Sequence, residues 1–119
     1  MASAVSPIVL VVEDEEDARE TLRELLELRG YNVRTAADGQ QALDAIDSAE
    51  LPICIVLLDL FMPNVDGWAV YETLQTRGQL ESLRVLITTS APHRAPAGSS
   101  VMGKPLDLSK LFELLQSCC

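Results

Sequence analysis

Short apolar runs alternate along the chain with longer segments in which apolar residues recur every three or four positions. The short runs are typical of strands, and a continuous β-branched run such as IVLVV is typical of a strand covered on both faces. The longer segments are typical of helices that bury one side. We therefore predict five strands, over residues 8–12, 32–36, 53–58, 84–88 and 101–103.

Helices are predicted between and after these strands. Their apolar stripes cover residues 15–29, the segment after Asp38, residues 68–76 and residues 108–116. Gly30 is suited to end the first helix in a left-handed conformation, and Asp38 and Asp107 are suited to cap the second and the last. Strands that alternate with helices in this way indicate an α/β fold with a parallel sheet and right-handed crossovers.

One interval breaks the alternation. Residues 90–100 read SAPHRAPAGSS, with two prolines, one glycine and no apolar stripe. Proline lacks a backbone N–H, and its ring clashes with the preceding helical turn. We therefore predict a loop here, at the position where the alternating pattern would place a fourth helix.

Length, charge and cysteine content narrow the possible functions. The 119 residues suit a single domain over 8–119, preceded by an N-terminal tail of residues 1–7. A net charge of −9 argues against nucleic-acid binding and against an anionic membrane surface. Cys54 is expected to be a small buried hydrophobe, and Cys118 and Cys119 to be free thiols at the chain end. No disulfide pattern is evident, which favours a cytoplasmic location.

Residues with reactive side chains follow the predicted strands. In a parallel sheet, ligands bind beyond the carboxyl ends of the strands. The residues at these ends are Glu13 and Asp14, Asp59, Thr89 and Ser90, and Lys104. Three carboxylates at one edge repel one another, and a hard divalent cation such as Mg²⁺ relieves this repulsion. The sequence therefore favours phosphoryl transfer to Asp59, with Mg²⁺, Lys104 and the Thr89 hydroxyl stabilising the phosphoryl oxygens.

Four segments carry a resemblance to a known family. In chain order they read VVEDEE, LLDLFMPNVDG, LITTSA and GKP. Together they resemble the receiver domain of two-component response regulators, from about residue 8 to the end of the chain. The resemblance implies a flavodoxin-like, doubly wound sheet of five parallel strands in the order 2-1-3-4-5.

The resemblance also implies a role for each site residue. Asp59 would be the phosphoacceptor, and Lys104, followed by a cis peptide bond, would contact the phosphoryl group. Mg²⁺ would be held by Asp59, by Asp14, by Glu13 (often through water) and by the backbone carbonyl of Phe61. The donor would be a phosphohistidine on a sensor histidine kinase or a histidine phosphotransfer protein. Such a domain is not a conventional enzyme, but it catalyses its own aspartyl phosphorylation and dephosphorylation.

The match to the family pattern leaves two points open. The usual interval from Asp59 favours Thr89 as the switch hydroxyl, with Ser90 as the alternative. Only 14 residues separate Thr89 from Lys104, where family members normally have a whole helix, and Val101 occupies a position that is usually aromatic. The loop and Val101 together suggest that the usual coupling machinery is altered. We therefore expect a single-domain switch, shuttle or sink for phosphoryl groups that signals through other faces.

Two alternatives from other classes remain. The first is a pseudo-receiver that is never phosphorylated and acts as a protein–protein interaction module, which the short interval before Lys104 favours. The complete set of acidic residues and lysine argues against it. The second is a metal-dependent phosphohydrolase with external substrates. It ranks last, because such enzymes usually carry an acidic residue two positions after the nucleophile, and that position is Phe61.

Overall fold

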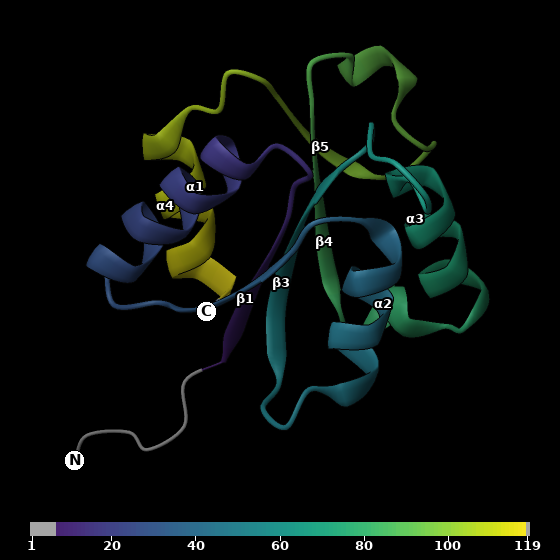
Figure 1. Cartoon of the computed structure of the whole chain (residues 1–119), viewed down its shortest axis with the longest axis horizontal. Helices are drawn as coiled ribbons and strands as arrows, with labels where there is room; N and C mark the ends of the chain where they lie inside the picture. Colours follow the sequence, from purple (N-terminus) through teal and green to yellow (C-terminus); the bar gives the residue numbers. More distant parts are fainter. Residues whose placement is uncertain (1–6, 119) are drawn as a thin grey trace.

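The computed structural model describes residues 7–118, and within that range the chain forms one five-stranded sheet flanked by helices (Figure 1). The strands are β1 (Ile8–Val12), β2 (Asn32–Ala36), β3 (Ile53–Asp59), β4 (Arg84–Thr89) and β5 (Ser100–Gly103). The helices are α1 (Glu16–Leu28), α2 (Gly39–Ser48), α3 (Gly67–Thr76) and α4 (Leu108–Cys118). Two short 3₁₀ turns, η1 (Gln79–Glu81) and η2 (Pro92–Arg94), precede and follow β4.

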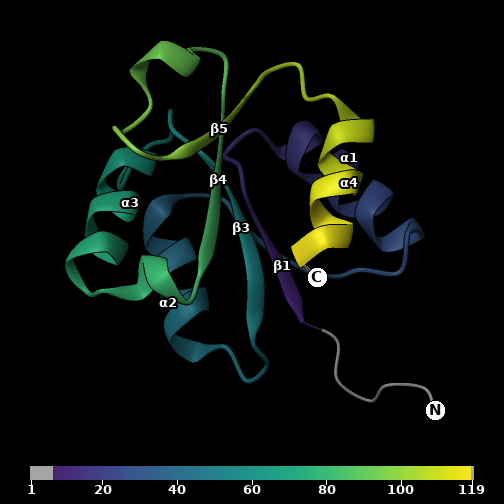
Figure 2. The same ribbon diagram turned by 180° about the vertical axis from the view of Figure 1, so that it is seen from behind.

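The sheet has the topology that the resemblance implied. Its strands are parallel and run in the order β2-β1-β3-β4-β5. Helices α1 and α4 cover one face, and α2 and α3 cover the other, as the two opposite views show (Figures 1 and 2). The doubly wound α/β prediction is therefore confirmed.

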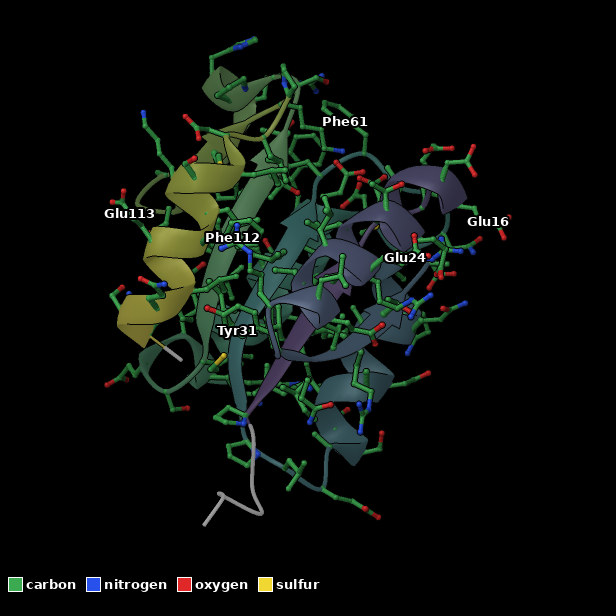
Figure 3. The ribbon with its side chains drawn as sticks, turned by 90° about the vertical axis from the view of Figure 1, so that its left-hand side faces the viewer. Glu16, Glu24, Tyr31, Phe61, Phe112 and Glu113 are labelled. Carbon is green, nitrogen blue, oxygen red and sulfur yellow. The ribbon has the colours of Figure 1, made fainter. Side chains whose placement is uncertain are left out.

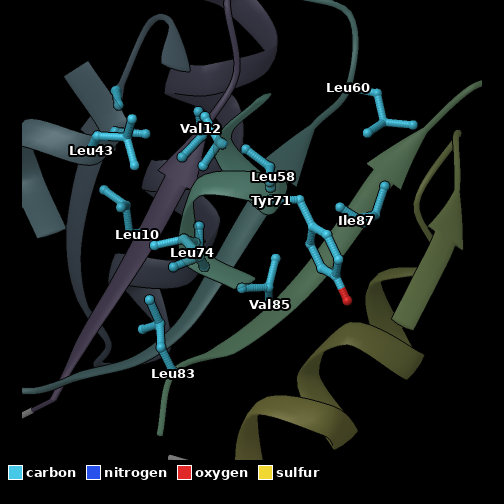
Figure 4. Packing of buried hydrophobic residues seen from close by; sticks show 14 residues of the cluster. Leu10, Val12, Leu43, Leu58, Leu60, Tyr71, Leu74, Leu83, Val85 and Ile87 are labelled. Atoms are coloured by element: carbon cyan, nitrogen blue, oxygen red, sulfur yellow. The ribbon is translucent and has the colours of Figure 1, made fainter. Parts of the chain in front are cut away.

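Two buried clusters hold these layers together, one on each face of the sheet. The central strands alternate their side chains between the two clusters, which is why β1 and most of β3 are apolar at every position. On the α2–α3 face, Tyr71 of α3 packs beside Val85 and Ile87 of β4 (Figure 4). Because both faces are buried, the central strands are rigid supports for the residues at their carboxyl ends.

Local signals in the sequence account for most element ends. The Asp38 carboxylate caps α2 by accepting a bond from Gln41 N at 2.8 Å, and Asp107 accepts from Lys110 N at 3.2 Å before α4. Gly30 ends the α1 segment with a φ of +89°, a conformation that favours glycine. The predicted bounds of β1 and β2 are confirmed, and β3 and β4 each extend one residue further than predicted.

The predicted loop between β4 and β5 is also present. Its only helical turn is η2, a 3₁₀ turn of three residues that starts at Pro92. The expectation for Cys54 is wrong, because Cys54 is partly buried and disulfide-bonded. The predicted tail lies outside the described residues except for Pro7, and so does Cys119. No helix in the described part of the chain is long and apolar enough to cross a membrane.

Candidate phosphoacceptor site

Three carboxylates meet at the carboxyl end of the sheet. β1 and β3 are neighbours, so Glu13 and Asp14 after β1 lie beside Asp59 at the end of β3. Carboxylate oxygens from all three lie within 4.8 Å of one another. Glu13 and Asp59 are only 8% and 4% exposed, while Asp14 is exposed. The sequence prediction that these three residues converge is confirmed.

Lys104 supplies the positive charge next to these carboxylates. Its Nζ lies 2.6 Å from Glu13 Oε1 and 3.4 Å from Asp59 Oδ1. The backbone of Lys104 is fixed by a bond from its N–H to the Thr89 carbonyl oxygen at 2.8 Å, and the expected cis peptide bond to Pro105 is present. We call Glu13, Asp14, Asp59 and Lys104 the carboxylate site.

The negative charge of the carboxylate site is only partly balanced by Lys104, so a further cation would be favoured there. Burial, and then the neighbouring Glu13 carboxylate, raise the pKa of Asp59 to about 6 although Lys104 acts in the opposite direction. Burial lowers the pKa of Lys104, but its contacts with Glu13 and Asp59 outweigh burial and raise that pKa overall. One ammonium group thus faces three carboxylates, and such a set of hard oxygen ligands suits a divalent ion such as Mg²⁺.

Arg19 organises the acidic segment in a way that the sequence analysis missed. Its Nη1 donates to the carbonyl oxygens of Glu13 at 3.0 Å and Asp14 at 3.4 Å. Glu13 Oε2 also accepts from Glu15 N at 3.2 Å, and the Glu15 side chain caps α1. Glu15 thus serves as the cap of α1. Arg19 lies six and five residues after Glu13 and Asp14, and no spacing rule in the sequence marks it as their partner.

A tight turn after β3 explains why glycine follows Asp66. The Gly67 N–H donates to the Leu60 carbonyl at 2.9 Å, and a Cβ at Gly67 would lie 2.3 Å from the Asp59 carbonyl oxygen. Asp66 caps α3 by accepting a bond from Ala69 N at 2.9 Å. The Asp66–Gly67 turn therefore has a structural role at the start of α3.

Phe61 and Trp68 lie together beside the carboxylate site. Phe61 is 41% exposed and meets the Trp68 ring edge-on, with 5.1 Å between the ring centroids. The guanidinium carbon of Arg94 lies 5.3 Å from the centroid of each ring. Trp68 Nε1 donates to the Arg94 carbonyl at 2.9 Å. We call Phe61, Trp68 and Arg94 the aromatic clasp; Arg94 was absent from the predicted site.

The two candidate switch hydroxyls differ in burial. Thr89 is fully buried at the end of β4, whereas Ser90 is exposed. Thr89 Oγ1 accepts a bond from Ala91 N at 3.0 Å, which leaves the hydroxyl proton available for an acceptor. The residue before it, Thr88, is paired with Asp59 in the β3–β4 register. Thr89 is therefore buried one residue beyond the strand position paired with Asp59, and it stays the stronger candidate.

Comparison with known proteins identifies the family. The model of the response regulator receiver domain matches residues 9–116, and the chain belongs to that family. It is 42% identical over 114 residues to the response regulator MprA of Mycolicibacterium vanbaalenii, covering 92% of this chain and 48% of that protein. It is 38% identical over 82 residues to the transcriptional regulatory protein CpxR of Escherichia coli K12, covering 69% of this chain and 33% of CpxR.

Solved structures agree with this assignment. The response regulator TrrA from Thermotoga maritima, determined in complex with Mg²⁺ and BeF, superimposes with a TM-score of 0.81 at 26% identity, covering 95% of this chain and 99% of TrrA. The receiver domain of the hybrid histidine kinase CckA gives a TM-score of 0.74 at 32% identity, covering 92% and 96%. The chain spans about half the length of MprA and a third of CpxR.

Proposed function

We propose that this receiver domain accepts a phosphoryl group on Asp59 in a Mg²⁺-dependent reaction. The observation that carries the proposal is the carboxylate site itself. Asp59 is 4% exposed, shares a cluster within 4.8 Å with two more carboxylates, and has Lys104 at 3.4 Å. Such a concentration of buried negative charge is costly for a fold to maintain, and a reaction that uses it accounts for its presence.

The transfer step follows from the positions of these groups. An Asp59 carboxylate oxygen attacks the phosphorus of a phosphohistidine, a P–O bond forms, and the P–N bond to the donor imidazole breaks. The departing imidazole nitrogen keeps the electron pair of that bond. Lys104 Nζ donates to one phosphoryl oxygen, and the Thr89 hydroxyl donates to another once the phosphoryl group is in place. Ser90 remains the alternative donor.

Glu13, Asp14 and Asp59, together with the Phe61 backbone carbonyl, are the residues that would hold the metal ion. A bound Mg²⁺ supplies positive charge that offsets the repulsion among the carboxylates and the negative charge of the phosphoryl oxygens. The Arg19 bonds to the Glu13 and Asp14 carbonyls support this assignment, because they fix the backbone that carries two of the ligands.

The partners and the role of the chain are part of the same proposal. The phosphoryl donor is a sensor histidine kinase or a histidine phosphotransfer protein in the cytoplasm, and the domain acts as a switch, shuttle or sink. The family match supports a histidine donor. The loop between β4 and β5, in the interval where the family pattern leads one to expect a helix, supports readout through other faces.

The first experiment adds acetyl phosphate, or beryllofluoride, with Mg²⁺ while Trp68 fluorescence is recorded. Trp68 contacts Phe61, two residues from Asp59, so metal binding and the phosphoryl mimic should both change its emission. Asp59→Asn serves as the control. A Mg²⁺-dependent change that is lost in Asp59→Asn, with a matching gain of phosphoryl mass in the intact protein, is the expected result.

The same experiment addresses the alternative of a pseudo-receiver that only binds partners. Unchanged Trp68 emission, together with an unshifted intact mass after treatment with the phosphodonor, would favour that alternative. The observation in its favour is the atypical connection between β4 and β5. The complete carboxylate site argues against it.

A further inference from the structure

Phe61 is a large apolar side chain kept at the surface next to a buried polar site. It is 41% exposed and follows Asp59 by two residues, after the fully buried Leu60. Figure 3 shows it at the end of the sheet where the strands finish. Leu28 and Val101 are the other exposed large hydrophobic residues in the described part of the chain, and neither lies in the loop after β3.

Two neighbours fix the orientation of the Phe61 ring. Trp68 meets it at an interplanar angle of 83°, a favourable edge-to-face arrangement. The Arg94 guanidinium lies 5.3 Å from the Phe61 centroid and 5.3 Å from the Trp68 centroid, so one cation contacts both rings. An exposed phenylalanine without such contacts would rotate among several conformers.

Arg94 is itself held through its main chain. Trp68 Nε1 donates to its carbonyl oxygen at 2.9 Å, and its own N–H donates to the Ala91 carbonyl at 3.0 Å within η2. The neighbouring Ala95 packs against the buried cluster on the α2–α3 face. Although Arg94 belongs to a loop, its backbone is fixed by these contacts, and its guanidinium is therefore held beside the two rings.

We propose that Arg94 is a positioning residue that, together with Trp68, holds the Phe61 side chain at the solvent side of Asp59 and so prolongs the life of the aspartyl phosphate. The inference rests on the proposed function, and it identifies residues that control how long the phosphorylated state lasts. In hydrolysis, a water oxygen bonds to phosphorus and the P–O bond to Asp59 breaks. The carboxylate is regenerated, and inorganic phosphate leaves with both protons of the water, one of which it exchanges with solvent.

The attacking water must reach phosphorus from the side opposite the Asp59 oxygen, since attacking and leaving oxygens lie roughly in line. A phosphoryl group on a buried carboxylate points toward solvent, and Phe61, two residues after Asp59 and 41% exposed, is the large apolar side chain that we place on that side. If the Phe61 ring is held over the phosphoryl group, it excludes water; a ring released from the aromatic clasp covers the group for a smaller fraction of the time. Loss of one cation–π contact changes the ratio of covered to uncovered conformers by about two- to fivefold.

The test uses the full chain, phosphorylated with acetyl phosphate and Mg²⁺ and then freed of the donor. Decay of the phosphorylated intact mass is followed with time for the wild type, Arg94→Ala and Arg94→Lys. Arg94→Ala is expected to shorten the half-life about two- to fivefold, and Arg94→Lys to restore part of it, because an ammonium also binds ring faces. Arg84→Ala, the same change at the amino end of β4, is the matched control and should leave the half-life unchanged.

Two further readouts separate positioning from general loosening. Mg²⁺ affinity, measured by titration of Trp68 emission, should be the same in Arg94→Ala as in the wild type. Phe61→Ala should shorten the half-life, and the double variant Phe61→Ala with Arg94→Ala should be no faster than Phe61→Ala alone, since both changes act through one ring. Additive effects, or a parallel loss of Mg²⁺ affinity, would overturn the inference.

The outcomes also separate the inference from the proposed function. If the wild type never gains phosphoryl mass, the proposed function fails and the inference fails with it. If the wild type is phosphorylated and Arg94→Ala decays at the wild-type rate or more slowly, only the inference fails.

Discussion

The carboxylate site and the connection between β4 and β5 (residues 90–99) lie at the same end of the sheet but are held in different ways. The carboxylate site follows β1 and β3, the central strands, and two of its carboxylates are almost fully buried. The connection is mostly exposed, contains a single 3₁₀ turn, and is joined to α3 by one indole hydrogen bond and ring contacts.

This difference predicts how strongly a substitution in the carboxylate site or in the connection will change the protein. Buried charges on rigid strands are expensive to disturb, so changes there should alter chemistry and stability by large amounts. Surface contacts of the kind that hold the connection are each worth about 1 kcal/mol or less, so changes there should be small and graded. Under the proposed function, we therefore predict that the sheet sets the reaction and the loop sets its tuning.

The largest effect is expected from Lys104→Ala. This change removes the one cation near both Glu13 and Asp59, at 2.6 and 3.4 Å, and with it a donor to the phosphoryl oxygens. Phosphorylation by acetyl phosphate should slow about a hundredfold, as when an enzyme loses one charge-stabilising donor. The measurement is the initial rate of mass gain, with Lys110→Ala on α4 as the matched control. A rate near that of the wild type would show that the carboxylate site does not depend on Lys104.

Asp59→Asn should abolish the phosphoacceptor and yet stabilise the metal-free fold. Burial, followed by Glu13, raises the pKa of Asp59 from 3.8 to about 6, so the ionised carboxylate destabilises the metal-free fold near neutral pH. The variant should raise the free energy of unfolding by about 1–3 kcal/mol without Mg²⁺. The gain should be largest above pH 6 and should shrink toward 3.8, where the native carboxyl is protonated.

Urea unfolding in EDTA, with Asp44→Asn on the exposed side of α2 as control, measures this effect. A loss of stability on replacing Asp59 would mean that its interaction with Lys104 outweighs burial. Excess Mg²⁺ should reverse the order of the two proteins, since only the wild type keeps all the carboxylate ligands.

The sequence was most informative where the physical signal is local. The bounds of β1 and β2, the capping role of Asp38 and the glycine after α1 all depend on neighbouring residues, and all are confirmed. The convergence of Glu13, Asp14 and Asp59 could be inferred because the ends of parallel strands meet at one edge, whatever the details of packing.

The contacts that the sequence analysis missed join segments that are distant along the chain or lie on different elements. Trp68 and Arg94 are 26 residues apart, and nothing in either segment marks them as partners. Arg19 lies on α1, and its guanidinium reaches back to the carbonyls of Glu13 and Asp14 in the segment before the helix. Cys54 was predicted to be a small buried hydrophobe because its local pattern is apolar, and its disulfide has no local signal.

A smaller effect is expected from Trp68→Phe on α3, the residue that joins α3 to the connection. The variant keeps an aromatic ring but loses the indole N–H that donates to the Arg94 carbonyl at 2.9 Å. Stability should fall by about 1 kcal/mol, the usual cost of one such hydrogen bond. Circular dichroism during urea unfolding is the measurement, and Mg²⁺ affinity by calorimetry should stay constant. A large loss of Mg²⁺ affinity would show that the two regions are not separable.

The smallest effect is expected from Asp38→Asn, at the residue that joins the start of α2 to the loop after β3. Its carboxylate accepts from Gln41 N at 2.8 Å and from Asn64 Nδ2 at 3.1 Å, and these two bonds, the backbone one first, lower its pKa. Asp38→Ala should reduce the free energy of unfolding by about 1 kcal/mol, and Asp38→Asn by only a few tenths because asparagine also caps helices.

The pH dependence sharpens this last prediction. A carboxyl group whose pKa is lowered by folding stabilises the protein above its ordinary value of 3.8, and that stabilisation is lost as the pH falls through the lower, folded value. The difference between the wild type and Asp38→Asn should therefore shrink as the pH falls through that lower value, whereas Asp38→Ala should remain less stable because it has no capping oxygen. If the Asp38→Asn difference persisted in acid, the charge of Asp38 would not be its cause. The link from the start of α2 to the loop after β3 would then depend on hydrogen-bond geometry and not on charge.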